Sequence, residues 1–368
     1  MAIIMLPKIK VNIYNIHDDF YHVKREWCEL CQTANPSFFL SWMWVENWIK
    51  TLPEKISVFL LIFKGGNIPK TGFFVGVPSP HFTNFFLSRL YLNTTGVQSF
   101  DKIYIEYNSI LVEGDSHVPM EEIVTVFPFA WDEFIMPGLK PQFYNFDSLS
   151  NAYNVSVNKV VSPYVDLAKV RENKLDFLGL LSNNTRAQIR RSYRSYQKLG
   201  DLSFQVASIP RQAMEILSEL KYHHQETWKI RGQLGCFSNN YFTKFHKRFV
   251  EKYFENGNIQ LAKLCCGNDV IGCLYNFISD NSIYFYQSGF AAVNDNKYKP
   301  GLMIHSEAIC YNAKKGVDIY DFLAGSSQYK KSLSTDEREM YWVKLQKKKL
   351  NVFVYNYAKK LYGKFKNF

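Results

Sequence analysis

Residues 319–333, with the sequence IYDFLAGSSQYKKSL, combine an acid, a flexible step and a cation that could together act on a carbonyl group. Asp321 lies in a short apolar run typical of a buried strand, where a carboxylate is costly unless it is paired or hydrogen-bonded. It is either a structural acid paired with Arg or Lys across the sheet, or a carboxylate that orients or deprotonates an acceptor. The Gly-Ser-Ser step at 325–327 permits a tight turn close to a ligand.

Lys330 follows this turn and also has two interpretations. It is either a solvated lysine beside Lys331, or a cation that stabilises the negative charge growing on a carbonyl oxygen. The order of acid, flexible loop and cation therefore predicts an arrangement around one reacting carbonyl.

A basic strip, RAQIRRSYRSYQK, begins at Arg186. On a helix, positions four residues apart share a face, so Arg190 and Arg194 lie in line with Arg186 and Lys198. Such a run is typical of a solvated face, but its density also suits binding of phosphate or an anionic glycan. Arg190 and Arg194 are therefore candidate substrate-binding residues. The sequence shows no recognised nucleic-acid-binding module.

His224, in the helical stretch HHQETWKIRG, is either a packing residue or part of the lining of an acceptor cleft. Because adjacent histidines point to different faces of a helix, His223 and His224 do not suit one metal ion. The cysteines form no zinc or disulfide framework, and the chain lacks a Ser-His-Asp elbow, a Walker loop and a Rossmann glycine set. These absences favour direct group transfer without a metal, in which positioning and electrostatics carry the rate.

The composition indicates a large folded protein with an anionic partner. A length of 368 residues favours two domains, and 47% hydrophobic with 17% aromatic residues exclude a disordered chain. The net charge of +11 favours a nucleotide cofactor, RNA or an anionic membrane surface. The first ten residues do not resemble a signal peptide, and the apolar run at 58–63 is too short to span a bilayer. We expect a cytoplasmic protein.

The periodicity of apolar residues predicts a mixed α/β fold. In the first half, helices are expected at 23–34, 39–51 and 119–130, and strands at 56–64, 72–77, 102–108, 109–114 and 132–137. The second half should contain a strand at 154–167, a helix capped by Asn183 or Asn184 and ending near 199, and a strand at 202–208. Helices at 210–230 and 239–255, a meander at 258–266, 269–279 and 282–290, a helix at 300–315, strands at 318–323 and 338–348, and a basic C-terminal helix should follow.

Six stretches in this order carry a resemblance to a known family: FFLSWMWVENW (38–48), YIEYNSILV (104–112), RAQIRRSYRSYQKLGDLSF (186–204), FYQSGF (285–290), YKPGLMIHSEAI (298–309) and YDFLAGSSQYKKSL (320–333). The sequence resembles the CelD/BcsL-like acetyltransferases named for cellulose biosynthesis, within the GNAT (Gcn5-related N-acetyltransferase) superfamily. It is more distantly similar to the FemX/FemAB aminoacyltransferases of cell-wall synthesis. The resemblance implies two tandem GNAT-like domains, 1–160 and 161–368, with catalysis in a cleft between them or within the second.

The resemblance also implies roles for single residues. Tyr329 and Lys330 would form an aromatic–lysine pair after the last core strand, next to Asp321 as base or orienting acid. The acceptor would be bound by Glu106, Asn108 and Tyr286, together with the candidates already named.

One departure from the family concerns the donor. GNAT enzymes carry an Arg/Gln-x-x-Gly-x-Gly/Ala loop ahead of the helix that cradles the pyrophosphate of coenzyme A, whereas this chain reads DNKYKPGLM at 295–303. Free N–H groups at the helix start still suit an anion. The expected donor-binding residues are Lys299, Gly301, Leu302, Met303 and Ile304. The donor is expected to be acetyl-CoA or another acyl-CoA, with aminoacyl-tRNA as the alternative.

The main hypothesis is a GNAT-type N- or O-acyltransferase that moves an acyl group from acyl-CoA to an amine or hydroxyl of a sugar or cell-envelope precursor. A FemX-like aminoacyl-tRNA-dependent transferase and a non-catalytic scaffold in polysaccharide assembly are the alternatives. The basic, aromatic segment 344–368 is either a helix packed by its aromatic face on the domain, or one that lies on the inner face of an anionic membrane.

Overall fold

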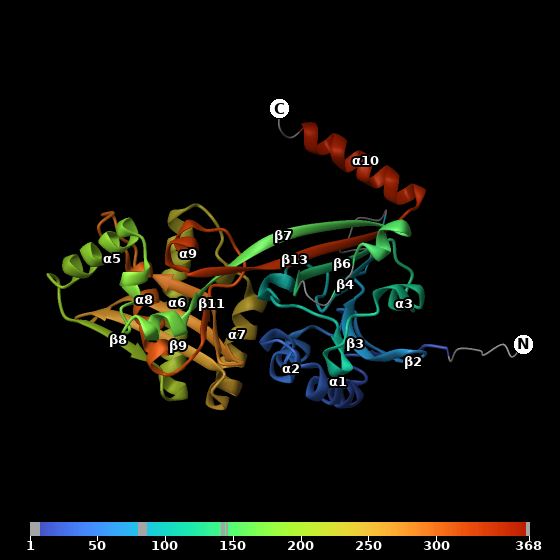
Figure 1. Cartoon of the computed structure of the whole chain (residues 1–368), viewed down its shortest axis with the longest axis horizontal. Helices are drawn as coiled ribbons and strands as arrows, with labels where there is room; N and C mark the ends of the chain where they lie inside the picture. Colours follow the sequence, from blue (N-terminus) through green and yellow to red (C-terminus); the bar gives the residue numbers. More distant parts are fainter. Residues whose placement is uncertain (1–7, 80–86, 141–143, 145, 366–368) are drawn as a thin grey trace, which may run out of the picture. The chain divides into compact units, whose positions relative to one another are not determined.

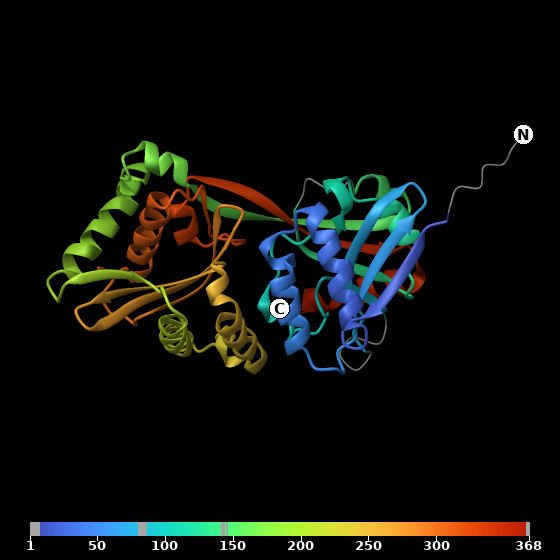
Figure 2. The ribbon, with the colours of Figure 1, turned by 90° about the horizontal axis from the view of Figure 1, so that it is seen from below.

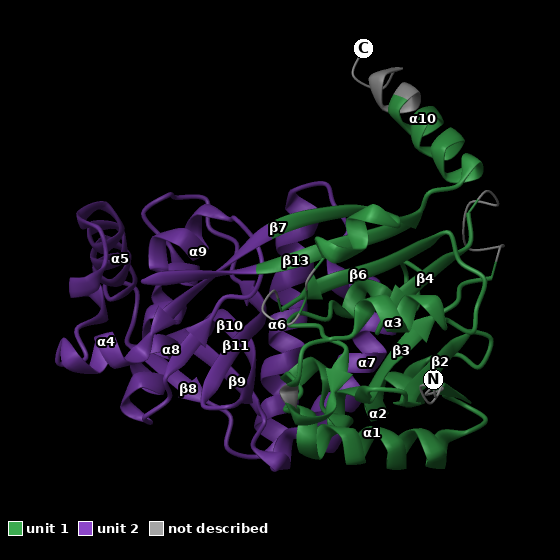
Figure 3. Ribbon diagram, turned by 45° about the vertical axis from the view of Figure 1, so that its right-hand side comes forward, with its two compact units in different colours: residues 1–159, 340–368 green, residues 160–339 purple. Residues whose placement is uncertain are grey.

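The computed structural model describes residues 8–79, 87–140, 144 and 146–365, which divide into two compact units. Unit 1 comprises residues 1–159 and 340–368, and unit 2 comprises residues 160–339 (Figure 3). The segment 340–368 therefore groups with the first unit, whereas the sequence-based domain 161–368 had placed it in the second. The chain passes between the units within two long strands, β7 (Tyr153–Asp166) and β13 (Asp336–Lys347).

Unit 1 is built around mixed strands in the order β1-β2-β3-β4-β6-β13. Its strands are β1 (Lys10–Asn15), β2 (Val58–Gly65), β3 (Ile68–Gly76), β4 (Arg89–Leu92), β5 (Leu111–Val112), which pairs with β3, and β6 (Glu133–Leu139). Its helices are α1 (Phe20–Ala34), α2 (Trp42–Thr51), α3 (Met120–Thr125) and α10 (Leu350–Phe365). The expected hairpin of β2 and β3 is confirmed.

Unit 2 has strands in the order β7-β12-β11-β10-β9-β8. The unit begins within β7. Its other strands are β8 (Leu202–Val206), β9 (Ile259–Cys266), β10 (Asp269–Ser279), β11 (Ser282–Phe290) and β12 (Ile319–Asp321). The helices are α4 (Leu167–Glu172), α5 (Asn183–Tyr196), α6 (Pro210–Ile230), α7 (Asn240–Tyr253), α8 (Pro300–Lys314) and α9 (Gln328–Leu333). The mixed α/β class predicted from the sequence is confirmed.

The helices of unit 2 cover both faces of its strands, as the ribbon of Figures 1 and 2 shows. On one face, Met303 and Ile304 of α8 and Ile189 of α5 share a core with strand residues such as Leu274. On the other face, Phe249 of α7 packs against Phe277 of β10. Because side chains alternate along a strand, each strand contributes to both cores.

The meander of β9, β10 and β11 agrees with the sequence because its turns have a clear chemistry. Asp280 and Asn281 both adopt positive φ, 47° and 53°, in the turn between β10 and β11. Asx residues tolerate this left-handed conformation, which a tight two-residue hairpin requires. Helix α5 also begins near its expected start, although its cap is Ser182, whose Oγ accepts the Thr185 N–H, rather than Asn183 or Asn184.

The strand expected at 102–108 is wrong. The segment contains a short 3-10 turn at Asp101–Ile103, and both Tyr104 and Tyr107 have positive φ. Ile103, Ile105 and Tyr107 are nevertheless buried, so the alternating pattern reports real burial without a strand. Only Asn108 forms an isolated bridge, to Leu139, within the part of unit 1 that is described.

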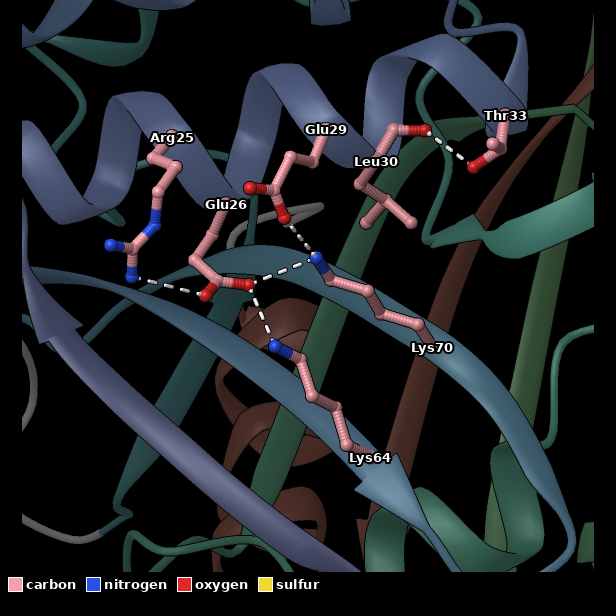
Figure 4. A network of polar contacts seen from close by, with 7 residues as sticks. All are labelled: Arg25, Glu26, Glu29, Leu30, Thr33, Lys64 and Lys70. Atoms are coloured by element: carbon pink, nitrogen blue, oxygen red, sulfur yellow. Dashed lines mark hydrogen bonds and ion pairs between the residues drawn. The ribbon is translucent and has the colours of Figure 1, made fainter.

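A buried acid ties α1 to the β2–β3 hairpin in unit 1. Glu26 of α1 is 5% exposed, and its Oε2 lies 2.9 Å from both Lys64 Nζ and Lys70 Nζ (Figure 4). Burial alone would raise the pKa of Glu26, but hydrogen bonds from the two lysines outweigh it and hold that pKa below its usual value. The ionised form therefore stabilises unit 1.

Replacing Glu26 with Gln should lower the free energy of unfolding by roughly 1.5–3 kcal/mol at neutral pH, the range for hydrogen bonds to charged groups. Because the folded pKa lies below the ordinary value of 4.5, the stabilisation is present above pH 4.5 and fades as pH falls through the folded pKa. Urea denaturation from pH 7 to pH 3 should show wild type and Glu26→Gln converging. Glu29→Gln, at a far more exposed partner of Lys70, is the control with a small effect. A gap that stays constant with pH contradicts this account.

Candidate active site

Strands β11 and β12 lie parallel for only three residue pairs, from Ser282–Ile319 to Tyr284–Asp321. On its other side β12 pairs with β7, and after Asp321 the chain stays on β7 but leaves β11: Phe322 N donates to Pro163 O at 3.0 Å, and Gly325 N to Val161 O at 3.0 Å. The pairing of β11 beyond Tyr284 is then with β10 alone among the described strands. One edge of residues 285–290 is thus left without a neighbouring strand.

A β-bulge lies next to this edge. The β10–β11 register pairs Asn276 with Phe285 and Tyr275 with Gln287, which leaves Tyr286 as the extra residue. A bulge bends its strand and re-aims its side chains. Tyr286 points into the aromatic core of α7, where its ring is parallel to that of Phe242 at 6.4 Å.

Asp321 is fully buried at the end of β12, and its carboxylate fixes the residues that follow this strand. Its Oδ1 accepts hydrogen bonds from Ser162 Oγ at 3.0 Å and from Leu323 N at 2.7 Å, and Arg338 Nε lies 3.8 Å from Oδ2. The bond to Leu323 accompanies a φ of 60° at that residue, an uncommon conformation for leucine. Of the two interpretations of Asp321, the arginine partner predicted for a structural acid is present.

Lys330 also holds the loop, from the first turn of α9. Its Nζ donates to Ala324 O at 2.9 Å and to Leu323 O at 3.3 Å. The half-buried ammonium group therefore sits over the turn that Asp321 begins. The sequence order of acid, flexible loop and lysine brings both charged groups to one turn.

Tyr329 packs on a buried histidine. Its ring is stacked on His305 of α8, with centroids 5.8 Å apart, and burial raises its pKa to about 12. His305 itself is fully buried, and its Nδ1 is 2.9 Å from the Tyr320 hydroxyl. Burial and the nearby charge of Lys330 lower the pKa of His305 to about 3. At neutral pH the tyrosine is therefore protonated and the histidine uncharged.

The start of α8 lies against α5. Ser192 of α5 accepts the N–H of Lys299 at 2.8 Å and donates to Met303 Sδ at 2.9 Å. Met303 N donates to Lys299 O at 3.2 Å, and the side chains of Met303 and Ile304 belong to the core. The N–H groups of Gly301 and Leu302 remain at the helix end, where the first N–H groups have no intrahelical acceptor.

Arg190 and Arg194 line a surface groove of about 700 Å³ on α5, with Asn183, Arg186, Ala187 and Tyr193. Tyr193 is fixed by a hydrogen bond to Glu307 of α8. Arg190 and Arg194 are exposed, and no carboxylate of the described residues forms an ion pair with them. The face predicted from the four-residue spacing is therefore present and electropositive.

His224 and Asn108 have their polar atoms bonded within the protein. His224 is buried on α6, where its Nε2 accepts from Trp228 Nε1 at 3.0 Å and Nδ1 contacts Gln225 Oε1 at 3.1 Å. In unit 1, Asn108 Nδ2 donates to Pro137 O at 2.9 Å, and its Oδ1 accepts from Asn93 Nδ2 at 2.7 Å. These contacts give both residues structural roles. Acceptor binding by His224, Tyr286, Asn108 and the half-buried Glu106 stays a prediction.

Ser162 and Arg338 were not singled out by the sequence. Ser162 is an ordinary small residue in β7, and Arg338 belongs to β13, so neither forms a local motif with Asp321. Across the described residues, no group of three or more His, Cys, Asp or Glu side chains is placed to hold a metal ion. Among the described helices, none combines the length and apolar character that crossing a bilayer requires.

Residues 183–331 match the family model described as an acetyltransferase (GNAT) domain. The matched region is similar to a GNAT domain and lies within unit 2. Its first element is α5 and its last is α9, so the parted strands β11 and β12, the start of α8 and the Asp321 turn all fall inside it. The narrower identity with CelD/BcsL-like enzymes is a proposal.

Solved structures with the same fold have low sequence identity. FemX is 10% identical with a TM-score of 0.57, covering 90% of this chain and 97% of that one. The C-terminal domain of a putative lysylphosphatidylglycerol synthetase from Agrobacterium fabrum is 11% identical with a TM-score of 0.54, covering 89% and 92%. A conserved protein of unknown function from Bacteroides thetaiotaomicron gives 10% and 0.53, covering 88% and 97%. No curated protein matches the sequence.

Replacing Asp321 with Ala should destabilise the protein, because Ser162 and Leu323 would lose a buried acceptor. A loss of roughly 2–4 kcal/mol in the free energy of unfolding is expected. The control is Asp269→Ala, at an exposed acid that begins β10. Denaturant unfolding of both variants is the measurement. An Asp321→Ala variant as stable as wild type would remove its structural role.

Proposed function

We propose that unit 2 transfers an acyl group, acetyl in the first instance, from acyl-CoA to an amine or hydroxyl of a sugar or cell-envelope precursor. The observation that carries this proposal is the separation of β11 from β12 inside the region that matches the GNAT family model. At the end of the open edge, the ring of Phe290 packs against Gly301 in the first turn of α8. The open edge of 285–290 offers backbone donors and acceptors to an extended amide-bearing chain, such as the pantetheine arm of coenzyme A. The N–H groups of Gly301 and Leu302 suit the pyrophosphate.

Basic side chains near the helix start replace the missing glycine-rich loop. Lys299 precedes α8, Lys297 is paired with Asp295 at 2.8 Å, and the charge of Arg191 on α5 also acts on Asp295. Cations here add to the favourable field at a helix N-terminus. The donor phosphates would therefore be held by charge as much as by backbone geometry.

In the proposed reaction, the acceptor nitrogen or oxygen attacks the thioester carbonyl, a bond to carbon forms and the carbon–sulfur bond breaks. Asp321 orients the turn through Leu323, and Lys330 stabilises the negative charge on the carbonyl oxygen. Tyr329 is protonated at neutral pH, and burial raises its pKa, so it donates a hydrogen bond to the leaving thiolate while the thiolate takes its proton from solvent. The proton lost by the acceptor passes to solvent or to a base of the acceptor site.

An aminoacyl-tRNA-dependent transferase is the second candidate. The arginine face of α5 favours it, because arginines without acidic partners suit a phosphate backbone. This reading predicts tRNA binding that weakens steeply with salt, and no binding of acetyl-CoA. If neither donor binds, the non-catalytic scaffold becomes the leading interpretation.

Acetyl-CoA should raise the unfolding temperature of the protein, since ligand at about 100 times its dissociation constant adds roughly 2.7 kcal/mol. Lys299→Glu should weaken this binding about tenfold or more, because it places a negative charge beside the phosphates. Lys315→Glu, at the opposite end of the same helix, is the matched control. Equal affinity of both variants would exclude the start of α8 as the donor site.

Replacing Lys330 with Ala should lower turnover by about 10- to 1000-fold if the ammonium group stabilises the developing oxyanion. The Michaelis constant for the donor should change little. Lys331→Ala, at the exposed neighbour, is the control. Steady-state kinetics and an unfolding curve of the same variant separate a catalytic from a structural role. Unchanged turnover with reduced stability would show that Lys330 only stabilises the loop.

A further inference from the structure

Helix α10 contacts unit 1 along one side. Val352 is buried, and Asn356 and Gln346 of β13 exchange hydrogen bonds through their amide groups at 3.1 and 3.2 Å. The guanidinium of Arg89 lies over the ring of Tyr355, 5.0 Å from its centroid. These contacts fix the rotation of the helix about its own axis.

The opposite side of α10 is apolar and exposed. Leu350, Phe353, Val354 and Tyr357 are 78%, 68%, 56% and 59% exposed. Their spacing of three, four and seven residues from Leu350 puts them in one stripe, turned away from Val352 and Asn356. Figure 3 shows α10 projecting from the strands of unit 1. The sequence-based alternative in which the aromatic face packs on the domain therefore does not hold for Phe353 and Tyr357.

Lysines lie near this stripe, and no acidic residue neighbours them in the sequence. Lys360, seven residues after Phe353, borders the stripe, whereas Lys359, seven residues after Val352, lies on the other side of the helix. Lys359 and Lys360 are exposed on α10, and Lys348 is exposed just before it. The sequence contains no Asp or Glu after Glu339. A second copy of the chain docking stripe to stripe would bring like-charged lysines together, whereas an anionic lipid surface offers both opposite charge and hydrocarbon.

We propose that α10 docks unit 1 on an anionic lipid bilayer. The stripe of Leu350, Phe353, Val354 and Tyr357 enters the boundary between headgroups and acyl chains, while the lysines contact lipid phosphates. A helix with one apolar face and a basic polar face lies in the plane of such an interface. The helix is bound to unit 1 on its other side, so docking leaves the fold of the unit unchanged.

Co-sedimentation of the full chain with vesicles tests this surface. Vesicles of phosphatidylcholine with phosphatidylglycerol should bind the protein, and vesicles of phosphatidylcholine alone should bind it far more weakly. Binding should fall as salt rises, because salt screens exposed charges. Equal binding to both kinds of vesicle, or binding to neither, overturns the proposal. This test uses no acyl donor, so it is independent of the proposed transferase activity.

Two variants with matched controls assign the binding to α10. Phe353→Ser with Tyr357→Ser should abolish most vesicle binding, whereas Leu199→Ser with Tyr222→Ser, which removes two comparably exposed apolar side chains from unit 2, should not. Because all four positions are exposed, both variants should unfold at the wild-type temperature. Vesicle binding that survives the α10 variant overturns the proposal.

The lysines have their own comparison. Lys360→Gln should weaken binding to anionic vesicles by roughly fivefold, the effect of one lysine near the surface. Lys315→Gln removes the same charge at the end of α8 and should have little effect. If both variants lost the same amount of vesicle binding, the net charge of the protein would explain the loss, and the assignment to α10 would be overturned. A concentration-dependent dimer that the Phe353 and Tyr357 changes abolish would assign the stripe to a second copy instead.

Discussion

The buried carboxylate of Asp321 fixes the point at which the chain leaves β11. Its oxygen accepts the Leu323 N–H and the Ser162 hydroxyl, while Arg338 supplies the balancing charge. A buried acid is tolerated only where such partners surround it. Because the turn is held at this residue, β12 stays short and the following chain runs along β7. The free edge of β11 is a direct consequence.

The open edge of β11 suits a donor site because the start of α8 and the residues of α9 lie in the same unit. Ser192 links the last turns of α5 to both Lys299 and Met303, so the start of α8 is held in place by side-chain hydrogen bonds as well as by its core residues. Lys330 and Tyr329 return to the same turn through α9, one bonding loop carbonyls and the other packing on His305. Backbone donors, cations and a protonated phenol thus gather within one unit, which is the set that acyl transfer requires.

The sequence predicted the parts of this arrangement that depend on local chemistry. The hairpin turn at Asp280 and Asn281, the helix beginning at Pro210 and the exposed basic face of α5 all follow from spacing and residue type. Helix α9 was not predicted, because it has only six residues and directly follows the Gly-Ser-Ser step, which indicates a loop. The segment before Asn108 was misread because its alternating residues are buried by tertiary packing rather than by strand pairing.

The partners of Asp321 could not be predicted from its neighbours in the sequence, for another reason. Ser162 precedes Asp321 by most of unit 2, and Arg338 comes from a strand that runs on into unit 1. No pattern within a window of sequence joins them, although the cost of a buried carboxylate did predict that a basic partner exists. The exposed stripe of α10 was equally undecided, since the same apolar spacing suits a packed helix and a docking helix.

Amide hydrogen exchange with and without coenzyme A is the most direct test of the donor site in unit 2. We predict slower exchange on binding at residues 285–290 of β11 and at Gly301 and Leu302, with α6 and unit 1 unchanged. Protection confined to other segments, or no protection at saturating coenzyme A, would contradict this prediction.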